Sequence, residues 1–244
     1  LTTCISTQAG CPLACRFCLT GLMGLRRNLR AAEIVGQILA LQDRLEQGER
    51  ITNIVLMGMG EPLLNFTQVE RALRILSDEQ GAHFSPRRIT LSTVGHIPGI
   101  QKLAASDLGI NLAVSLNATT DAVRDEIMPI NRRWPIAELL VACRAYPLPN
   151  RRWLTFEYVM LDGVNDSRED AKRLVGLLHG IRCKINLLPF NTAPDLPDRA
   201  SPRERVEVFQ RVLHDAGLTA TIRESRGWDI SAACGMLRVE KENA

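Results

Sequence analysis

Long apolar runs are missing from this chain. No stretch of about twenty apolar residues, the length needed to cross a membrane, occurs in its 244 residues. Residues 1–4 have neither the basic start nor the apolar stretch of a secretion signal. These absences predict a cytoplasmic protein that lies in no membrane. Because the first residue is Leu rather than Met, we also expect the chain to be a fragment or a processed product.

A cysteine framework is missing as well. The chain has seven cysteines, an odd number, whereas disulfide scaffolds are typical of short secreted chains with paired cysteines. A structural zinc site needs four ligands, usually from two separated C-x-x-C or C-x-x-H pairs, and no matching second pair is present. The sequence therefore argues against both a disulfide scaffold and a zinc-stabilised module.

Neither sign of charge is in large excess. Lys and Arg total 30, Asp and Glu total 27, and the net charge is only +3. No long basic run and no basic stretch interleaved with aromatic residues marks a nucleic-acid surface. Short basic groups do recur, and they can either neutralise phosphates or simply lie in solvent. They are Arg26-Arg27 with Arg30, Arg87-Arg88, Arg132-Arg133 and Arg151-Arg152.

The chain does have a regular alternation of short β-rich runs and longer amphipathic stretches, which predicts β-α units and a parallel sheet. Its length and 45% hydrophobic content suit one sizeable domain, and no repeat, low-complexity tract or linker marks a second. Six strands, enough for a partial barrel, are predicted at Thr2–Ser6, Asn53–Leu56, Arg88–Ser92, Asn111–Ser115, Thr155–Met160 and Cys183–Leu188. The predicted helices are Ala31–Leu45, Thr67–Leu76, Pro98–Ala105, Pro135–Ala145, Ser167–Leu178 and Pro202–Ala216, followed by an apolar segment around Thr219–Ile222.

Polar and small residues gather where the predicted strands end. In a parallel β/α fold these ends meet on one face, and ligands bind there. The segments in question are a cysteine-rich loop after the first strand, Gly58-Met59-Gly60-Glu61-Pro62, Ser92-Thr93, Ser115-Leu116-Asn117 and Pro189-Phe190-Asn191.

The cysteine-rich loop has three cysteines in eight residues, Cys11, Cys15 and Cys18, with the spacing C-x3-C-x2-C. Close cysteine runs of this kind hold iron-sulfur clusters. Three thiolates bind three irons of a four-iron cube and leave the fourth iron open for chemistry. The spacing resembles that of the radical S-adenosylmethionine (SAM) superfamily, in which SAM occupies the open iron, but a short motif needs support from its context.

That context is a series of longer strings in a fixed order. They are GMGEPLLN at 58–65, LSTVG at 91–95, AVSLNA at 113–118, EYVMLDGVND at 157–166, KINLLPFN at 184–191 and RGWDISAACG at 226–235. Together with the cysteine loop they resemble the RlmN/Cfr family of radical SAM RNA methyltransferases over nearly the whole chain. The resemblance implies an α/β fold with the radical SAM partial (β/α)6 barrel, a 4Fe-4S cluster and SAM.

The resemblance also implies roles for particular residues. Cys11, Cys15 and Cys18 match the cluster ligands. The residues that match SAM contacts are Gly60, Glu61, Ser92, Ser115, Leu116, Asn117 and Asn191. A carboxylate suits the ammonium of SAM, while hydroxyls and amides suit its ribose, adenine and carboxylate. Taken singly, a glycine pair at a strand end usually forms only a turn, and a lone Ser or Asn there usually caps the next helix.

Two further cysteines match the distinctive residues of the family. Cys234 matches a cysteine that carries the methyl group, and Cys4 matches its partner in a transient disulfide. Without the resemblance, both would be interpreted as small buried hydrophobic residues, the usual state of a free cysteine. Cys143 and Cys183, on apolar helix and strand patterns, keep that interpretation.

The activity implied by the resemblance is methylation of adenosine at carbon 2. The implied substrates are 23S ribosomal RNA at the peptidyl transferase centre and the adenosine at position 37 of some transfer RNAs. Two SAM molecules would be used per turnover, the first to methylate Cys234 and the second to start radical transfer through a covalent protein-RNA intermediate. A monomer reduced by flavodoxin or ferredoxin is expected.

This chain departs from the family at its start. Family members carry an N-terminal accessory domain that helps to bind RNA, together with an acidic proton acceptor, and both lie upstream of Leu1. We therefore expect residues 1–244 to be the radical SAM catalytic core alone and to bind RNA more weakly than a longer relative. Three alternatives stay open: a Cfr-like enzyme acting on carbon 8, a radical SAM enzyme acting on a protein, and a zinc-holding RNA-binding module.

Overall fold

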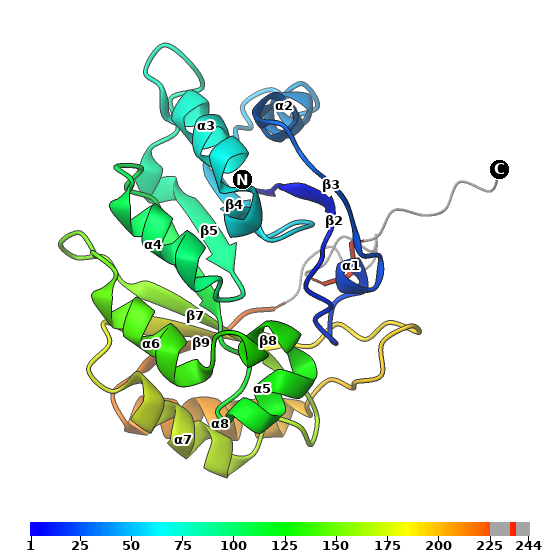
Figure 1. Ribbon diagram of the computed structural model, residues 1–244, viewed down its shortest axis with the longest axis vertical. Helices are drawn as coiled ribbons and strands as arrows, with labels where there is room; N and C mark the ends of the chain where they lie inside the picture. The colour runs from blue at the N-terminus through cyan, green and yellow to red at the C-terminus, as the bar shows by residue number, and fades with distance from the viewer. Residues whose placement is uncertain (225–234, 238–244) are drawn as a thin grey trace.

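The sheet predicted from the sequence forms the centre of the molecule. The computed structural model describes residues 1–224 and 235–237, and within them seven parallel strands curl into a half-barrel (Figure 1). In spatial order they are β1 (Thr2–Cys4), β4 (Asn53–Leu56), β5 (Ile89–Thr93), β6 (Asn111–Ser115), β7 (Leu154–Met160), β8 (Cys183–Pro189) and β9 (Thr219–Ile222). The predicted α/β partial barrel is confirmed.

Helices follow the strands and lie along the outer side of the sheet, as Figure 1 shows for α3, α4, α6 and α7. The helices are α1 (Leu19–Leu22), α2 (Ala31–Gln42), α3 (Phe66–Ser77), α4 (Ile97–Ala105), α5 (Asp121–Ile127), α6 (Ile136–Ala145), α7 (Arg168–Leu178) and α8 (Arg203–Asp215). Short 3₁₀ turns at Pro62–Asn65, Pro86–Arg88 and Pro129–Arg132 each begin with a proline, whose fixed φ suits a first helical position.

The hydrophobic core lies between the sheet and these helices. Alternate strand residues such as Ile54, Leu56, Ile89 and Leu91 are buried in one cluster with residues of the helices. The intervening residues, Val55, Thr90, Ser92 and Ser115 among them, point to the opposite, inner face and are only half-buried. The inner face is therefore the one that remains open to a ligand.

Several elements of the structure differ from the predicted ones. The strand predicted to reach Ser6 ends at Cys4, and a separate antiparallel ribbon of β2 (Gln8–Gly10) and β3 (Leu25–Asn28) comes next. The last apolar segment is a seventh parallel strand, β9, and the helix α5 was not predicted. The helix predicted to end at Leu45 ends at Gln42.

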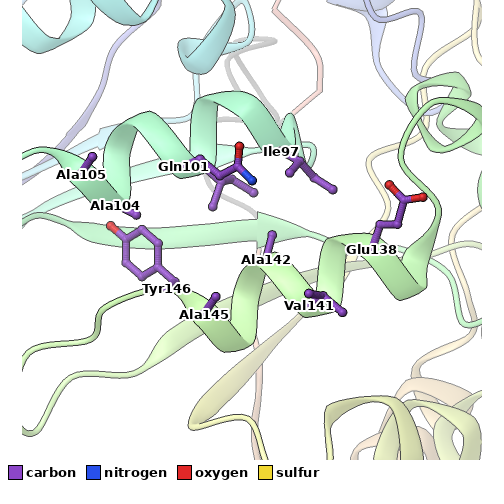
Figure 2. A pocket seen from close by; sticks show the side chains of 10 residues that line it. Ile97, Gln101, Ala104, Ala105, Glu138, Val141, Ala142, Ala145 and Tyr146 are labelled. Carbon is purple, nitrogen blue, oxygen red and sulfur yellow. The ribbon is translucent and has the colours of Figure 1, made fainter.

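Among the described residues, no helix is long and apolar enough to cross a membrane. An apolar groove of about 590 Å³ lies between α4 and α6, shown in Figure 2. It is lined by Ile100, Gln101, Val141, Ala142 and Tyr146 among others, on the outer helical side of the sheet. None of the predicted site residues lines it, so it is not the predicted site.

Candidate functional site

The three cysteines lie on a tight loop, residues 11–18, which we call the cysteine loop. It follows β2 directly and packs beside β3, because the backbone N–H of Cys11 donates to the carbonyl of Gly24 at 2.9 Å. Its second half closes as a turn in which the N–H of Cys18 donates to the carbonyl of Cys15 at 3.1 Å. Ala14 takes a positive φ of 50°, which folds the loop back on itself. The loop thus brings Cys11, Cys15 and Cys18 into one neighbourhood.

Burial and neighbouring thiols affect the pKa values of Cys11 and Cys15. Burial raises the pKa of Cys11 to about 11, and negative charge on Cys18 and Glu61 raises it as well. Burial likewise raises the pKa of Cys15, with further contributions from charge on Cys18 and Cys11. Three neighbouring thiolates repel one another, so a bound cation is needed to hold them all deprotonated.

Two carboxylates from other parts of the fold bind Arg16 of the cysteine loop. The guanidinium of Arg16 donates to both oxygens of Asp198, at 3.0 and 2.7 Å, and also pairs with Glu126. The side chain of Asp198 is only 6% exposed, so this bidentate pair is well shielded from solvent. The N–H of Arg16 also donates to the carbonyl of Ile127 at 2.9 Å. The loop is therefore attached to α5 and to the segment after β8.

Residues 235–237 lie against the same loop. The N–H of Leu19 donates to the carbonyl of Gly235 at 2.8 Å, and the hydroxyl of Thr20 donates to the carbonyl of Leu237 at 2.5 Å. Met236 packs against the hydrophobic cluster that contains Cys15 and Leu19. The far end of the chain thus returns to the cysteine loop. Cys234, which the sequence predicts to carry the methyl group, lies outside the described residues.

A glycine turn after β4 forms the next part of the site. Gly60 has a φ of +102°, and a Cβ built on it would lie 2.5 Å from the Cβ of Gln8. The side-chain oxygen of Gln8 accepts a hydrogen bond from the N–H of Glu61 at 2.9 Å. Only glycine provides both the conformation and the space that this close approach needs.

Replacing Gly60 by Ala is therefore expected to destabilise the protein by more than about 2 kcal/mol, because positive φ and a steric clash are combined. The matched control is Gly36→Ala, since Gly36 lies within α2 and a Cβ there meets nothing within 4 Å. That change is expected to stabilise the helix by up to about 1 kcal/mol. Urea unfolding of the two variants tests the contrast, and equal stabilities would contradict it.

Glu61 is a buried carboxylate, 2% exposed, at the end of the same turn. Its oxygens accept from the N–H of Val94 at 2.9 Å and the N–H of Leu63 at 3.1 Å. Burial raises the pKa of Glu61 to about 7, although hydrogen bonds from Val94, Thr93 and Leu63 lower it. The side chain thus joins the loops that follow β4 and β5, and it keeps lone pairs for a ligand.

The raised pKa of Glu61 predicts that the stability of the folded protein depends on pH. The folded protein holds the Glu61 proton up to about pH 7, whereas the unfolded chain releases it near 4.5. Stability is therefore lost as the pH rises from about 4.5 through 7, by up to about 3 kcal/mol. Glu61→Gln removes this loss, so the difference in unfolding free energy between wild type and variant should change between pH 5 and pH 8. A constant difference would refute the prediction.

The predicted residues of β5 and β6 fall into two groups. Ser92 and Ser115 are half-buried on the inner face, and their hydroxyls have no hydrogen-bond partner among the described residues. Leu116 is fully buried, and its N–H donates to the carbonyl of Glu157 at 3.0 Å. The two serines are thus available to a ligand, while Leu116 offers no exposed side chain.

Asn117 is buried and already bonded within the protein. It has a φ of 56°, and its side-chain oxygen accepts from the N–H of Val159 at 2.9 Å. Its side-chain N–H donates to the sulfur of Met128 at 3.3 Å, and its carbonyl accepts from Asn165 at 2.7 Å. The side chain therefore joins β6 to β7.

The last two predicted residues lie at opposite edges of the site. Asn191 follows β8 and is half-buried. Cys4 is the last residue of β1, is exposed, and pairs in register with Val55 of β4. All predicted residues that the structure describes thus lie at the carboxyl ends of strands or on the loops that follow them.

Arg124 is a residue of the site that the sequence reasoning missed. It is 1% exposed and donates to the carbonyls of Val94 at 2.7 Å, Ser115 at 3.1 Å and Leu116 at 2.9 Å. It also donates to the side-chain oxygen of Asn131 at 2.9 Å. Arg124 thereby joins the ends of β5 and β6, and an arginine on an otherwise mixed helix gave no sequence signal of this role.

Comparison with known proteins identifies this arrangement. The model of the radical SAM superfamily matches residues 5–175. The dual-specificity RNA methyltransferase RlmN of Syntrophus aciditrophicus is 54% identical over 97% of this chain and 68% of its own length. That of Geotalea uraniireducens is 53% identical over 100% of this chain and 69% of its own length. The chain belongs to the RlmN family of radical SAM enzymes. The crystal structure of a radical SAM methyltransferase from Sphaerobacter thermophilus, 50% identical, superposes with a TM-score of 0.94 over 97% of this chain and 70% of its own.

A radical SAM enzyme uses a 4Fe-4S cluster and SAM, and the residues present fit both. The described residues contain no group of three or more His, Cys, Asp or Glu placed to hold a single metal ion. The three thiols of the cysteine loop are near enough for charge on one to raise the pKa of another, and thiolates are the ligands that hold a 4Fe-4S cluster. Ser92 and Ser115 have unbonded hydroxyls on the inner face, and hydroxyls suit the polar groups of SAM.

Proposed function

We propose that this chain methylates carbon 2 of adenosine in RNA. Its proposed substrates are 23S ribosomal RNA at the peptidyl transferase centre and transfer RNA at position 37. The observation that carries the proposal is the cysteine loop, which lies within a chain 54% identical to a dual-specificity RNA methyltransferase. The adenine carbon is electron-poor and cannot displace the methyl group of SAM as a nucleophile. A thiol that accepts the methyl group first removes this difficulty.

Each group of side chains has a separate role in the proposal. Cys11, Cys15 and Cys18 hold the cluster, and the residues at the strand ends from Gly60 to Asn191 surround SAM. When bound, the cluster and SAM would supply one electron and a carbon-centred radical that removes a hydrogen atom from the methyl group on a cysteine sulfur. Glu61 and Asn117, whose side chains join neighbouring loops, fix the backbone around SAM.

The two remaining cysteines form the second part of the proposal. The thiolate of Cys234 takes a methyl group from one SAM molecule, and after radical transfer its sulfur links the protein to the RNA through that carbon. Carbon 2 then loses its own proton, and the adduct gives back the one electron supplied at the start. The thiolate of Cys4 attacks the sulfur of Cys234, the carbon-sulfur bond breaks, and the freed carbon takes up a proton, which releases methyladenosine and leaves a disulfide. Two features support this. Gly235, the next residue, accepts a hydrogen bond from Leu19, which directly follows the cysteine loop, and Cys4 is exposed at the end of β1.

The methylated cysteine is testable by intact-protein mass spectrometry. We expect the purified protein with a reconstituted cluster to gain about 14 Da, one CH₂ group, after incubation with SAM. Cys234→Ala should not gain it, and Cys183→Ala, a buried cysteine on β8, should gain it as wild type does. If the wild-type protein has the same mass with and without SAM, methylation of Cys234 is refuted.

The target atom and the partners need a second experiment. Digestion of 23S ribosomal RNA and transfer RNA after reaction, followed by mass spectrometry, distinguishes 2-methyladenosine from the carbon 8 product of a Cfr-like enzyme. We further propose that the chain acts as a monomer with flavodoxin or ferredoxin as electron donor. Residues 1–244 would form the radical SAM catalytic core.

A further inference from the structure

The four basic groups of the sequence lie in different parts of the fold. Arg87-Arg88 and Arg151-Arg152 directly precede β5 and β7, so they lie at the amino ends of strands, opposite the site. Arg27 and Arg30, at the β3 ribbon, pair with Glu33 at 2.9 and 3.5 Å. Arg132-Arg133 comes after α5, on the site end of the sheet. The four basic groups look alike in the sequence, but of these only Arg132-Arg133 combines a place at the site end of the sheet with the absence of a pairing to Glu33.

Arg132-Arg133 is close to the cysteine loop. The last residue of α5, Ile127, accepts a hydrogen bond from Arg16 of that loop, and the 3₁₀ turn at Pro129–Arg132 begins two residues later. Ile130, within this turn, packs against the same hydrophobic cluster as Cys15. A group bound at this turn therefore lies beside the catalytic centre.

Both arginines are exposed and form no ion pair with the described residues. The acids around this turn are engaged elsewhere or form no ion pair with it. Glu126 pairs with Arg16, Asp121 accepts from the N–H groups of Asn131 and Ile136, and Asp125 accepts from Asn131. No ion pair between described residues joins Glu138 to Arg132 or Arg133. Two full positive charges are thus left for an external anion.

An aromatic side chain stands next to these charges. The guanidinium carbon of Arg133 lies 4.8 Å from the centre of the Trp134 ring. The ring of His96 meets the same ring edge-on at 4.8 Å and so holds it in place. An unstacked RNA base is recognised by stacking on an aromatic or guanidinium plane, with phosphates held by neighbouring arginines.

We propose that Arg132, Arg133 and Trp134 form a contact surface for single-stranded RNA next to the cysteine loop. The arginines bind backbone phosphates and Trp134 stacks on a base that flanks the target adenosine. This inference rests on the proposed function, because it assigns a place on the protein to the RNA substrate.

The chain provides a closely matched control. Arg87-Arg88, like Arg132-Arg133, is an exposed pair at the end of a 3₁₀ turn that begins with proline, but it lies at the other end of the sheet. The variants R132E/R133E and R87E/R88E change the net charge equally. Binding is measured on the full chain with its cluster, by fluorescence anisotropy of a labelled RNA hairpin with an adenosine in its loop, over a range of salt concentrations.

We expect R132E/R133E to weaken RNA binding about tenfold or more at low salt and to reduce the salt dependence, as expected when two phosphate contacts are lost. R87E/R88E should change affinity by less than about twofold. Trp134→Ala should weaken binding while leaving the salt dependence unchanged, because stacking releases no counterions. SAM cleavage under dithionite without RNA should be the same in all variants.

The other outcomes of this experiment distinguish a failure of the RNA contact surface from a failure of the proposed function. If wild type binds the hairpin and R132E/R133E binds it equally well, or if both pairs weaken binding to the same extent, the surface is wrong and the proposed function stands. If R132E/R133E keeps its RNA affinity but is reduced more slowly by an acidic electron-transfer protein, the surface belongs to that protein and the proposal is overturned. If wild type binds no RNA at low salt, both the surface and the proposed function fail.

Discussion

Cys15→Ala is expected to leave the protein unable to hold a four-iron cluster and to lower RNA methylation by more than about a hundredfold. Cys15 is the most buried of the three thiols, at 8% exposure, and it packs in the cluster formed with Leu19, Ile127 and Met128. With only three thiolates available, the loss of one leaves two irons without a protein ligand. Iron content and the visible absorbance of the anaerobically reconstituted protein measure the effect.

Cys143→Ala is the control for this prediction. Cys143 lies in α6, is 2% exposed, and belongs to the main hydrophobic core rather than to the site. Its loss leaves a small cavity that is expected to cost about 1 kcal/mol or less. Iron content should equal that of wild type. A cluster that persists in Cys15→Ala, or one that is lost equally in both variants, would mean that the cysteine loop is not its site.

The strands of the sheet were predictable because each carries a local signal. Cys183–Pro189 and Asn111–Ser115 are apolar and β-rich, and six of the seven parallel strands were predicted within a few residues. The ribbon of β2 and β3 was not, since all four residues of β3 are exposed and show no alternation. The helix α5 is only seven residues long, and its buried side chains include the charged Arg124. Tertiary contacts determine these elements, and the sequence pattern does not.

The place of the site was predictable and its hydrogen bonding was not. Parallel strands bring their carboxyl ends to one edge, so Gly60, Ser92 and Ser115 had to lie near one another. The bonds of Glu61 to Val94 and of Asn117 to Val159 depend on which loop lies next to which. The sequence alone does not show which loops are neighbours in the fold. As a result, two residues predicted to contact SAM through their side chains also join neighbouring strand ends.

These bridges form a continuous series along the edge of the sheet. Gln8 bonds to Glu61, which bonds to Val94; Arg124 bonds to Val94 and also to the end of β6. Asn117 then joins β6 to β7. Because the bridging side chains of Gln8, Glu61, Asn117 and Arg124 are all buried, the backbone of the site is held in one arrangement before any ligand binds. Arg124 is the member with the most bonds, so its removal should have the largest effect.

Arg124→Met is accordingly expected to destabilise the protein by about 3–5 kcal/mol. The methionine fills much of the same volume but leaves the carbonyls of Val94, Ser115 and Leu116 without their donor. Arg124→Lys keeps the charge and has three donors on one nitrogen, which cannot reach acceptors spread over two strands, so an intermediate loss is expected. Arg71→Met, on the exposed face of α3, should change stability by no more than about 0.5 kcal/mol.

Arg124→Met also tests whether Arg124 interacts electrostatically with the cysteine loop. Burial lowers the pKa of Arg124 to about 10, and the negative charge of Cys15 acts in the opposite direction, so the two groups lie within electrostatic reach of each other. A thiolate-bound cluster at the cysteine loop would provide the buried arginine with a nearby negative charge. Urea unfolding should therefore show that cluster loading stabilises wild type and Arg124→Lys more than Arg124→Met. Equal stabilisation of all three would show that Arg124 acts only through the carbonyl groups.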